Sequence, residues 1–269
     1  MKEKILTQEI VEELGLNKVS VITADMLEGY TGITSDAFVD CKSLTSVTIP
    51  DSVMSIGWCA FCDCSSLTSV TIPDSVTSIG NYAFYRCSSL TSISIPNGVT
   101  NLGMRAFSGC KSLVSIIIPN SVKTVGDFAF GGCTGLTYVT IPNSVTSIED
   151  RAFHGCTSLT SLTIGDKIYK QQIVTNGKCK AYKAFNGSMK CRGFQYKEGE
   201  TYELEGKPKL CERGFHACLN LADVFNYYYG KFGKNVVIHE VELEGVTDER
   251  LKFDSKVVAG KITIGKRIL

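Results

Sequence analysis

Hydrophobic and polar positions recur with a period of 23 along residues 33–164. Within one repeat, Leu67, Val70 and Ile72 alternate with Ser69 and Thr71, which is typical of a short strand with one buried face. A fixed period of this length predicts a repeat protein in which each unit forms one coil. The aligned units read LTSVTIPDSVMSIGWCAFCDC, LTSVTIPDSVTSIGNYAFYRC, LTSISIPNGVTNLGMRAFSGC, LVSIIIPNSVKTVGDFAFGGC and LTYVTIPNSVTSIEDRAFHGC.

The remainder of each unit predicts how the coil closes. Pro73 lacks an N–H group for a strand ladder, so it ends the strand at a corner. The Ala83–Phe84 pair is expected on a short helical or 3₁₀ segment, with the ring filling the centre of the coil. The partial units GITSDAFVDC and LTSLTIGD flank the five full ones, which gives about six coils. Stacked coils bury a shared core and form a parallel sheet along one side.

Half of the cysteines follow the repeat. One cysteine per unit at the same place indicates a packing position, and we expect these residues to be buried free thiols that act as small hydrophobes. No disulfide framework is predicted. The six are Cys41, Cys64, Cys87, Cys110, Cys133 and Cys156.

The string LTSVTIPDSVTSIGxxAFxxCxSL is similar to the BspA-type leucine-rich repeat of bacterial, protozoan and phage proteins. The resemblance implies a curved solenoid that binds proteins or host surfaces and carries no catalytic residues. The fold class predicted is therefore an α/β leucine-rich-repeat solenoid of 23-residue coils, with a parallel sheet on one side, plus a small C-terminal α+β domain.

The segments outside the repeat define the other domains. Residues 1–32 contain LTQEIVEELGL, an amphipathic helix with Gly15 as its C-cap, and are expected to cap the first coil. The solenoid covers residues 33–165 and a junction covers 166–176. Residues 177–269 are expected to form the α+β domain, with strands at KCKAYKAF, GETYELEG, NVVIHEVELEG and KVVAGKITIG and a helix at LNLADVFNYYYGKFG.

Charge and hydropathy narrow the function. The chain has 28 basic and 27 acidic residues and a net charge of +1, which gives no indication of nucleic-acid or membrane binding. No apolar stretch reaches the length of a membrane-spanning helix. Acidic residues interrupt the apolar positions of the first residues, which argues against a signal peptide. We therefore expect a cytoplasmic protein that needs no cofactor, and the resemblance to the BspA-type repeat implies a bacterial or phage origin.

Function in a repeat protein lies where the repeats differ. A variable zone flanks the Ala-Phe pair, and its aromatic, Arg and Met residues are the types enriched at interaction hot spots. The partner-binding surface is predicted there, at Trp58, Tyr82, Tyr85, Arg86, Met104, Arg105 and Phe128. The Ser/Thr-rich strands carry a second candidate, an apolar patch of Val114, Ile117 and Tyr138.

The C-terminal domain leaves a metal site open. Its strings KCRGFQY and LCERGFHAC resemble an uncharacterised domain found in phage and bacterial proteins, often after repeats. Cys and His are zinc ligands, so Cys211, His216 and Cys218 form a candidate zinc site with Cys191 or Cys179 as the fourth ligand, although their spacing is irregular. Half-buried thiols and a surface histidine are the alternative, and no metal is assigned.

A transferase is the alternative function. The order of GFHA, ADVFNYY and HEVELEG loosely resembles ADP-ribosyltransferases, in which a strand glutamate orients a ribose hydroxyl and stabilises an oxocarbenium ion. The resemblance would place the site at Arg192, His216, Tyr228, Glu240 and Glu242. Such glutamates more often form the solvent face of a strand. The sequence favours a non-enzymatic interaction module that presents its repeats to a protein partner.

Overall fold

The computed structural model describes residues 4–149, 151–170, 178–186, 190–191, 194–203, 215–218, 236–244, 246, 256–259 and 261–267. Contacts divide the chain into one unit of residues 1–168 and another of residues 169–269. Each unit is described separately below.

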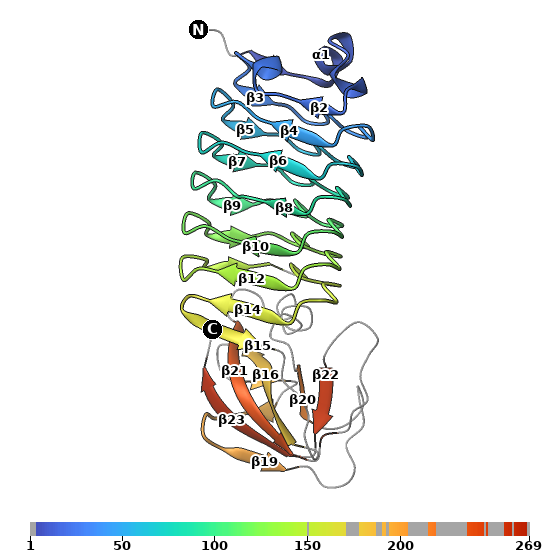
Figure 1. The fold of residues 1–269 in the computed structure, drawn as a ribbon. Coiled ribbons are helices and arrows are strands. Elements are labelled where there is room, and N and C mark those ends of the chain that lie inside the picture. The colour runs from blue at the N-terminus through green and yellow to red at the C-terminus, as the bar shows by residue number, and fades with distance from the viewer. Residues whose placement is uncertain are drawn as a thin grey trace. The chain divides into compact units, whose positions relative to one another are not determined.

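The first unit is a stack of coils with one strand of each coil in a common row (Figure 1). Between residues 46 and 164 the paired strands are parallel and offset by 23 residues, as in Val47↔Val70. Val70 and Ile72 are buried while Ser69 and Thr71 are exposed, so the predicted coil is confirmed. The row comprises two sheets, β2-β4-β6-β8 and β10-β12-β14-β15. The strands are β2 (Val21–Ile22), β4 (Ser46–Thr48), β6 (Ser69–Thr71), β8 (Ser92–Ile93), β10 (Ser115–Ile117), β12 (Tyr138–Ile141), β14 (Ser161–Ile164) and β15 (Lys167–Lys170).

A second row of strands runs along the coils, which the sequence did not predict. Each member has two residues, and Ser55↔Ser78 and Ile56↔Ile79 show the same parallel register. The apolar member of each pair faces the core. These strands form a seven-stranded sheet in the order β1 (Ile5–Leu6), β3 (Gly32–Ile33), β5 (Ser55–Ile56), β7 (Ser78–Ile79), β9 (Asn101–Leu102), β11 (Thr124–Val125) and β13 (Ser147–Ile148).

Stacked phenylalanines fill the centre of the solenoid. Neighbouring rings have centroids 5.0–5.5 Å apart and interplanar angles of 2–9°. This spacing is close to the distance of about 4.8 Å between adjacent strands, so each coil contributes one ring. The rings number the coils 1 to 6: Phe38, Phe61, Phe84, Phe107, Phe130 and Phe153, all of them buried.

The Ala-Phe corner is a turn, and the helical or 3₁₀ segment predicted there is wrong. Its backbone bonds to the next coil instead: the Phe61 N–H donates to the Ala83 carbonyl at 2.8 Å, and Phe84 donates to Ala106 at the same distance. A helix would have to satisfy these groups within the corner itself. Bonding between coils therefore fixes the corner in a conformation that short-range sequence preferences do not indicate.

The N-terminal end of the stack carries the helix expected from the sequence. Helix α1 (Gln8–Glu13) starts at Thr7, whose hydroxyl accepts a hydrogen bond from the Ile10 N–H. Gly15 follows it with φ +68°, a left-handed conformation that glycine adopts without steric penalty. The 3₁₀ turns η1 (Leu16–Lys18) and η2 (Asp25–Leu27) lie at the same end (Figure 1).

The second unit contains a mainly antiparallel sheet in the order β19-β23-β21-β16-β20-β22. Ile238, Val241, Leu243, Ile262 and Ile264 are buried in it. The expected helix at residues 219–233 lies outside the described residues. The strands are β16 (Lys178–Asn186), β19 (Thr201–Glu203), β20 (Phe215–Cys218), β21 (Val236–Glu244), β22 (Lys256–Ala259) and β23 (Lys261–Arg267), with β17 (Lys190–Cys191) and β18 (Phe194–Gln195) as a separate pair.

Candidate functional site

Two positions of each Ala-Phe corner have a left-handed backbone. They lie two residues before and two residues after the core phenylalanine, and every coil repeats them. The positions before it are Asp36, Cys59, Tyr82, Arg105, Phe128 and Arg151, with φ between +51° and +59°. The positions after it are Asp40, Asp63 and Arg86 in coils 1–3 and Gly109, Gly132 and Gly155 in coils 4–6. This geometry turns the variable residues outward at the same place in each coil.

Hydrogen bonds between coils hold this corner rigid. The Tyr82 N–H donates to the Met104 carbonyl at 2.9 Å, and the Arg105 N–H donates to the Asp127 carbonyl at 2.8 Å. The Arg86 N–H donates to the Ser108 carbonyl at 2.8 Å in the same way. Equivalent side chains therefore project from a fixed backbone about one strand spacing apart.

The side chains at and beside these positions contact one another from coil to coil. The Trp58 and Tyr82 ring centroids are 6.0 Å apart. The Arg105 guanidinium lies 5.7 Å from the Tyr82 ring and 4.9 Å from the Phe128 ring. The Arg151 guanidinium lies 5.6 Å from the Phe128 ring. Trp58, Tyr82, Arg105, Phe128 and Arg151 thus form a continuous series, which we call the aromatic–arginine ladder.

Further rings and cations widen the ladder. Tyr85 meets Tyr82 edge-on with centroids 5.5 Å apart, and the Arg86 guanidinium lies 4.9 Å from the Tyr85 ring. His154 meets Phe128 edge-on at 5.9 Å. Six of the seven residues predicted as the partner surface are joined by these contacts. The seventh, Met104, is 37% exposed beside Arg105, with its N–H bonded to the side chain of Asn81.

A recess of about 570 Å³ lies beside the ladder, across coils 2–6. We call it the Arg105 groove. Three cations line it, Arg86, Arg105 and Lys111, and its acidic lining residue is Asp63, whose carboxylate is 3.8 Å from Arg86. The other lining residues are Ser65, Tyr85, Ser88, Ser108, Gly109, Phe128, Gly131, Gly132 and His154. Lys111 and the glycines were not among the predicted site residues.

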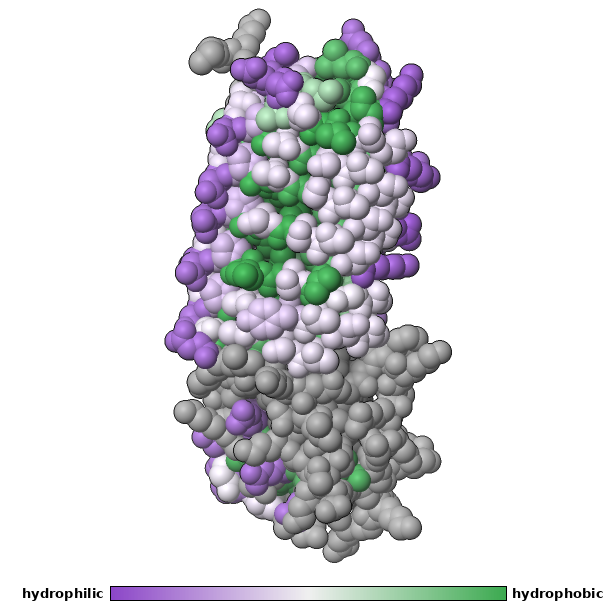
Figure 2. All heavy atoms as spheres, viewed as in Figure 1, coloured by the Kyte–Doolittle hydropathy of each residue, from purple (hydrophilic) through white to green (hydrophobic). Residues whose placement is uncertain are grey.

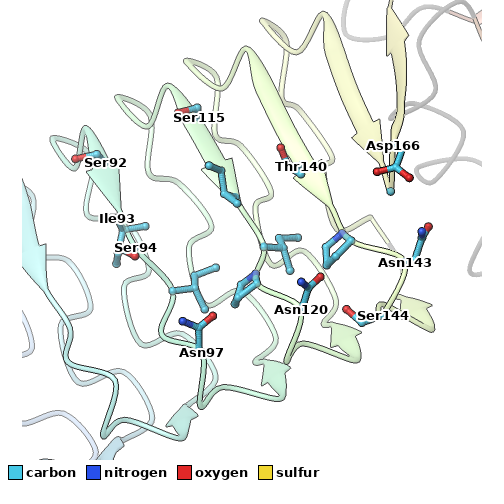
Figure 3. Close-up of a pocket in the computed structure, with 16 residues that line it drawn as sticks. Ser92, Ile93, Ser94, Asn97, Ser115, Asn120, Thr140, Asn143, Ser144 and Asp166 are labelled. Carbon is cyan, nitrogen blue, oxygen red and sulfur yellow. The ribbon is translucent and has the colours of Figure 1, made fainter.

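The row of Ser/Thr strands carries a larger recess of about 730 Å³, the sheet-face groove (Figure 3). Ser92, Ser115 and Thr140 lie on its strands, and the amides of Asn97, Asn120 and Asn143 lie beyond them at successive corners (Figure 3). Among the described residues that line it, Asp166 carries the single ionisable side chain. The groove is therefore polar but nearly uncharged.

The second predicted patch lies beside this groove. Val114 and Ile117 are 52% and 68% exposed. Tyr138 is half-buried, and its hydroxyl lies 3.0 Å from both Thr140 Oγ1 and Thr163 Oγ1. Figure 2 shows pale side chains of intermediate hydropathy on either side of an interrupted hydrophobic band on the side of the repeats that faces the viewer. The polar end of Tyr138 is thus already engaged by the sheet, which leaves Val114 and Ile117 as the apolar part.

The repeated cysteines are free thiols, but they are more than small hydrophobes. From Cys64 onward, the Sγ of each repeated cysteine donates to the carbonyl of the phenylalanine one coil earlier, for example Cys87 to Phe61 at 3.1 Å and Cys133 to Phe107 at 3.1 Å. Burial raises the pKa of Cys87 and Cys110, and it raises the pKa of Cys133 to about 12. A thiol held protonated in this way is neither a nucleophile nor a metal ligand.

Among the described residues, no group of three or more His, Cys, Asp or Glu side chains is placed to hold a metal ion. The zinc alternative in the second unit is not tested by this finding. Cys211 lies outside the described residues, while Cys191 falls in β17 and both His216 and Cys218 fall in β20. That alternative stays a prediction.

The transferase candidates are placed only in part. Glu240 is half-buried and Glu242 is exposed, and they alternate along β21 with the buried residues His239, Val241 and Leu243. The register sets Tyr182 of β16 opposite Glu240 on one side and opposite Cys218 of β20 on the other. His216 therefore lies two strands from the glutamates, and Arg192 and Tyr228 lie outside the described residues.

Comparison with known proteins identifies the repeat. The family model for the BspA type leucine rich repeat region matches in six copies over residues 16–133 and 102–195. The chain belongs to the BspA-type leucine-rich-repeat family. Leucine-rich-repeat proteins generally bind other proteins. A second model, for a domain of unknown function (DUF7666), matches residues 179–269 of this BspA-type protein.

Solved structures resemble its repeats. The T. pallidum leucine-rich-repeat protein is 35% identical, with a TM-score of 0.52, over 56% of this chain and 71% of that one. A leucine-rich cell surface protein from Faecalibacterium prausnitzii is 30% identical over 55% of this chain and 52% of that one, with a TM-score of 0.45. A leucine-rich-repeat protein from Bacteroides ovatus is 28% identical over 56% of this chain and 46% of that one, with a TM-score of 0.44. A comparison with curated proteins finds no match.

No helix in the described part of the chain combines the length and apolar composition needed to cross a bilayer.

Proposed function

We propose that this BspA-type protein is a non-enzymatic interaction module that binds a protein partner through the aromatic–arginine ladder. The observation that carries the proposal is the unbroken series of contacts from Trp58 to Arg151. It spans coils 2–6, a length of about 20 Å at one strand spacing per coil. That length suits the recognition of an extended segment or the flank of a folded domain.

The chemistry of the ladder supports a protein partner. Tyr, Trp and Arg supply most hot-spot residues at protein interfaces because they combine large contact areas with a polar or charged group. The hydrogen-bonded corner backbone orients them before binding, so little backbone entropy is lost on association. The hydroxyl-covered sheet face offers no comparable anchors apart from Val114 and Ile117.

We also propose that the protein is bacterial or phage-encoded and acts in the cytoplasm. The organisms of the similar solved structures support a bacterial source. The eight cysteines of the first unit are free, which is compatible with the reducing conditions of a cytoplasm. Fractionation of the source cells, followed by detection of the protein, tests the compartment.

The binding surface is tested by paired substitution. We expect Tyr85→Ala with Arg86→Ala to weaken binding to a captured partner by at least about 2 kcal/mol without changing stability, as hot-spot residues do. The matched control is Val114→Ala with Ile117→Ala on the sheet face, which should leave binding intact. Affinity is measured by calorimetry and stability by thermal unfolding. Weakened binding by the Val114→Ala and Ile117→Ala variant, with unchanged binding by the Tyr85→Ala and Arg86→Ala variant, would place the binding site on the sheet face instead.

A further inference from the structure

We propose that the Arg105 groove binds an acidic peptide segment of the partner, with its carboxylates between Arg86, Arg105 and Lys111; this inference rests on the proposed function. The positive charge of the groove indicates that its occupant is acidic. Among the described residues that line the recess, three are cations and the single carboxylate, that of Asp63, is set beside Arg86. An acidic segment would supply the negative charge that the protein itself does not provide there.

The cations of the groove are available to a ligand. No carboxylate of the described residues forms an ion pair with Arg105 or Lys111. Arg105 is held over the Tyr82 and Phe128 rings, a contact that fixes the plane of the guanidinium while leaving its N–H groups for an acceptor. The contact between Arg86 and Asp63 is 3.8 Å long and exposed, so it competes weakly with a ligand carboxylate.

Glycines create the space for the segment. In coils 1–3 the left-handed position after the phenylalanine carries a side chain, whereas in coils 4 and 5 it is Gly109 and Gly132, which line the groove. Gly131 lines it as well. A Cβ at Gly109 would come within 3.2 Å of Arg86 Cγ. Replacing side chains by glycine lets a peptide backbone approach the solenoid closely.

The observations favour a peptide over a single-stranded nucleic acid, which also combines negative charge with affinity for aromatic rings. Bases bind by stacking on free ring faces. Arginine guanidinium groups lie over the Tyr85 and Phe128 rings. Nucleic-acid grooves also follow many phosphates with a continuous basic surface, whereas this chain carries almost equal numbers of acidic and basic residues.

The test uses the full chain and a fluorescein-labelled hexaglutamate peptide, with fluorescence anisotropy as the readout. We expect hexaglutamate to bind at an ionic strength of about 0.05 M and hexaglutamine to bind at least about tenfold more weakly. Arg105→Gln combined with Lys111→Gln should weaken hexaglutamate binding about tenfold. Lys123→Gln is the matched control, because Lys123 is exposed and does not line the groove.

A second pair of variants tests the place of binding without removing any cation. Asp40 and Asp63 show that aspartate occupies this left-handed position in coils 1 and 2. A Cβ at Gly132 would meet its nearest atom at 3.9 Å, so both Gly132→Asp and Gly132→Asn should fold. The two side chains have the same size and differ in charge. Gly132→Asp should bind hexaglutamate about tenfold more weakly than Gly132→Asn does.

Three outcomes overturn the inference. One is equal binding of hexaglutamate and hexaglutamine, and another is equal binding by the two Gly132 variants. The third is tighter binding of an oligothymidylate through the same cations, which would assign the groove to nucleic acid. The proposed function is judged separately. A partner whose binding is lost on Trp58→Ala, which lies outside the groove, but is unaffected by Gly132→Asp would retain the ladder and exclude the acidic segment.

Discussion

At the scale of single residues, the ladder combines a costly backbone conformation with large side chains. A left-handed backbone costs a residue other than glycine about 1–2 kcal/mol. The chain uses glycine for the second such position in coils 4–6 but never for the first, where Tyr82, Arg105, Phe128 and Arg151 stand. The side chains at the first position therefore contribute something that glycine would lack, and a binding surface accounts for them.

This reasoning predicts the effect of Arg105→Gly. We expect the free energy of unfolding to stay within about 1 kcal/mol of the wild type, because the lost ring contacts are offset by relief of the backbone strain. Arg105→Val should lose more stability, since a β-branched residue fits the left-handed region poorly. Urea unfolding of both variants measures the difference. A glycine variant less stable than the valine variant would contradict the interpretation.

The buried thiols predict a loss of stability at alkaline pH. Burial raises the pKa of Cys133 in the folded protein to about 12, whereas an unfolded thiol has a pKa of about 8.5. Below about pH 8.5 both states are protonated and the thiol's contribution is complete. Above it the unfolded state loses the proton first, so the free energy of unfolding falls by about 1.4 kcal/mol per pH unit for each such thiol until the folded pKa is reached.

Urea unfolding between about pH 8 and pH 10.5 measures this dependence. Cys133→Ser is the comparison, because serine can keep the hydrogen bond to the Phe107 carbonyl and does not ionise in this range. Its stability should fall less steeply with pH. If the free energies of unfolding of the variant and the wild type changed equally with pH, the thiol of Cys133 would ionise as readily in the folded state as in the unfolded state.

At the scale of the elements, the repeat period was enough to predict the coils, the buried positions and the rows of equivalent side chains. The sequence did not indicate the second sheet, because a two-residue strand such as Ser78–Ile79 shows no alternation of its own. The Ala-Phe corner resembled a helix because its hydrogen bonds to the next coil leave no mark on the local pattern. The sequence did not predict the Arg105 groove, because glycines create its space and a glycine has no side chain to mark a binding site in the sequence.

The phenylalanine stack predicts where the solenoid is most sensitive to substitution. Phe107→Ala should lower the free energy of unfolding by about 3–5 kcal/mol, the range for emptying a large buried aromatic site. Phe107 stacks between Phe84 and Phe130 at 5.5 Å on each side, so its removal disrupts two ring contacts. Denaturant unfolding measures the loss, and Phe107→Leu serves as a smaller change. A loss under about 1 kcal/mol would show that the ring is not part of the core.

At the scale of the whole molecule, the chain contains a repeat unit whose surface chemistry indicates where a partner binds and a second unit that matches a domain of unknown function. The repeats offer two faces of different chemistry: a charged, aromatic ladder at the Ala-Phe corners and a nearly uncharged hydroxyl face on the strands. The family match indicates protein binding in general. The surface chemistry supports our proposal that the first face is the one that binds. The C-terminal domain matches a family of unknown function, and the transferase and zinc alternatives stay predictions for it.

The most direct test of the central claim is site-specific photocrosslinking in the source cells. Photoreactive benzoylphenylalanine replaces Tyr85 beside the ladder in one variant and Ile117 on the sheet face in the other; Tyr85 is half-buried and Ile117 is exposed. The account predicts that the Tyr85 variant crosslinks to one defined protein and that the Ile117 variant does not. Crosslinking of a partner from position 117, with none from position 85, would contradict it.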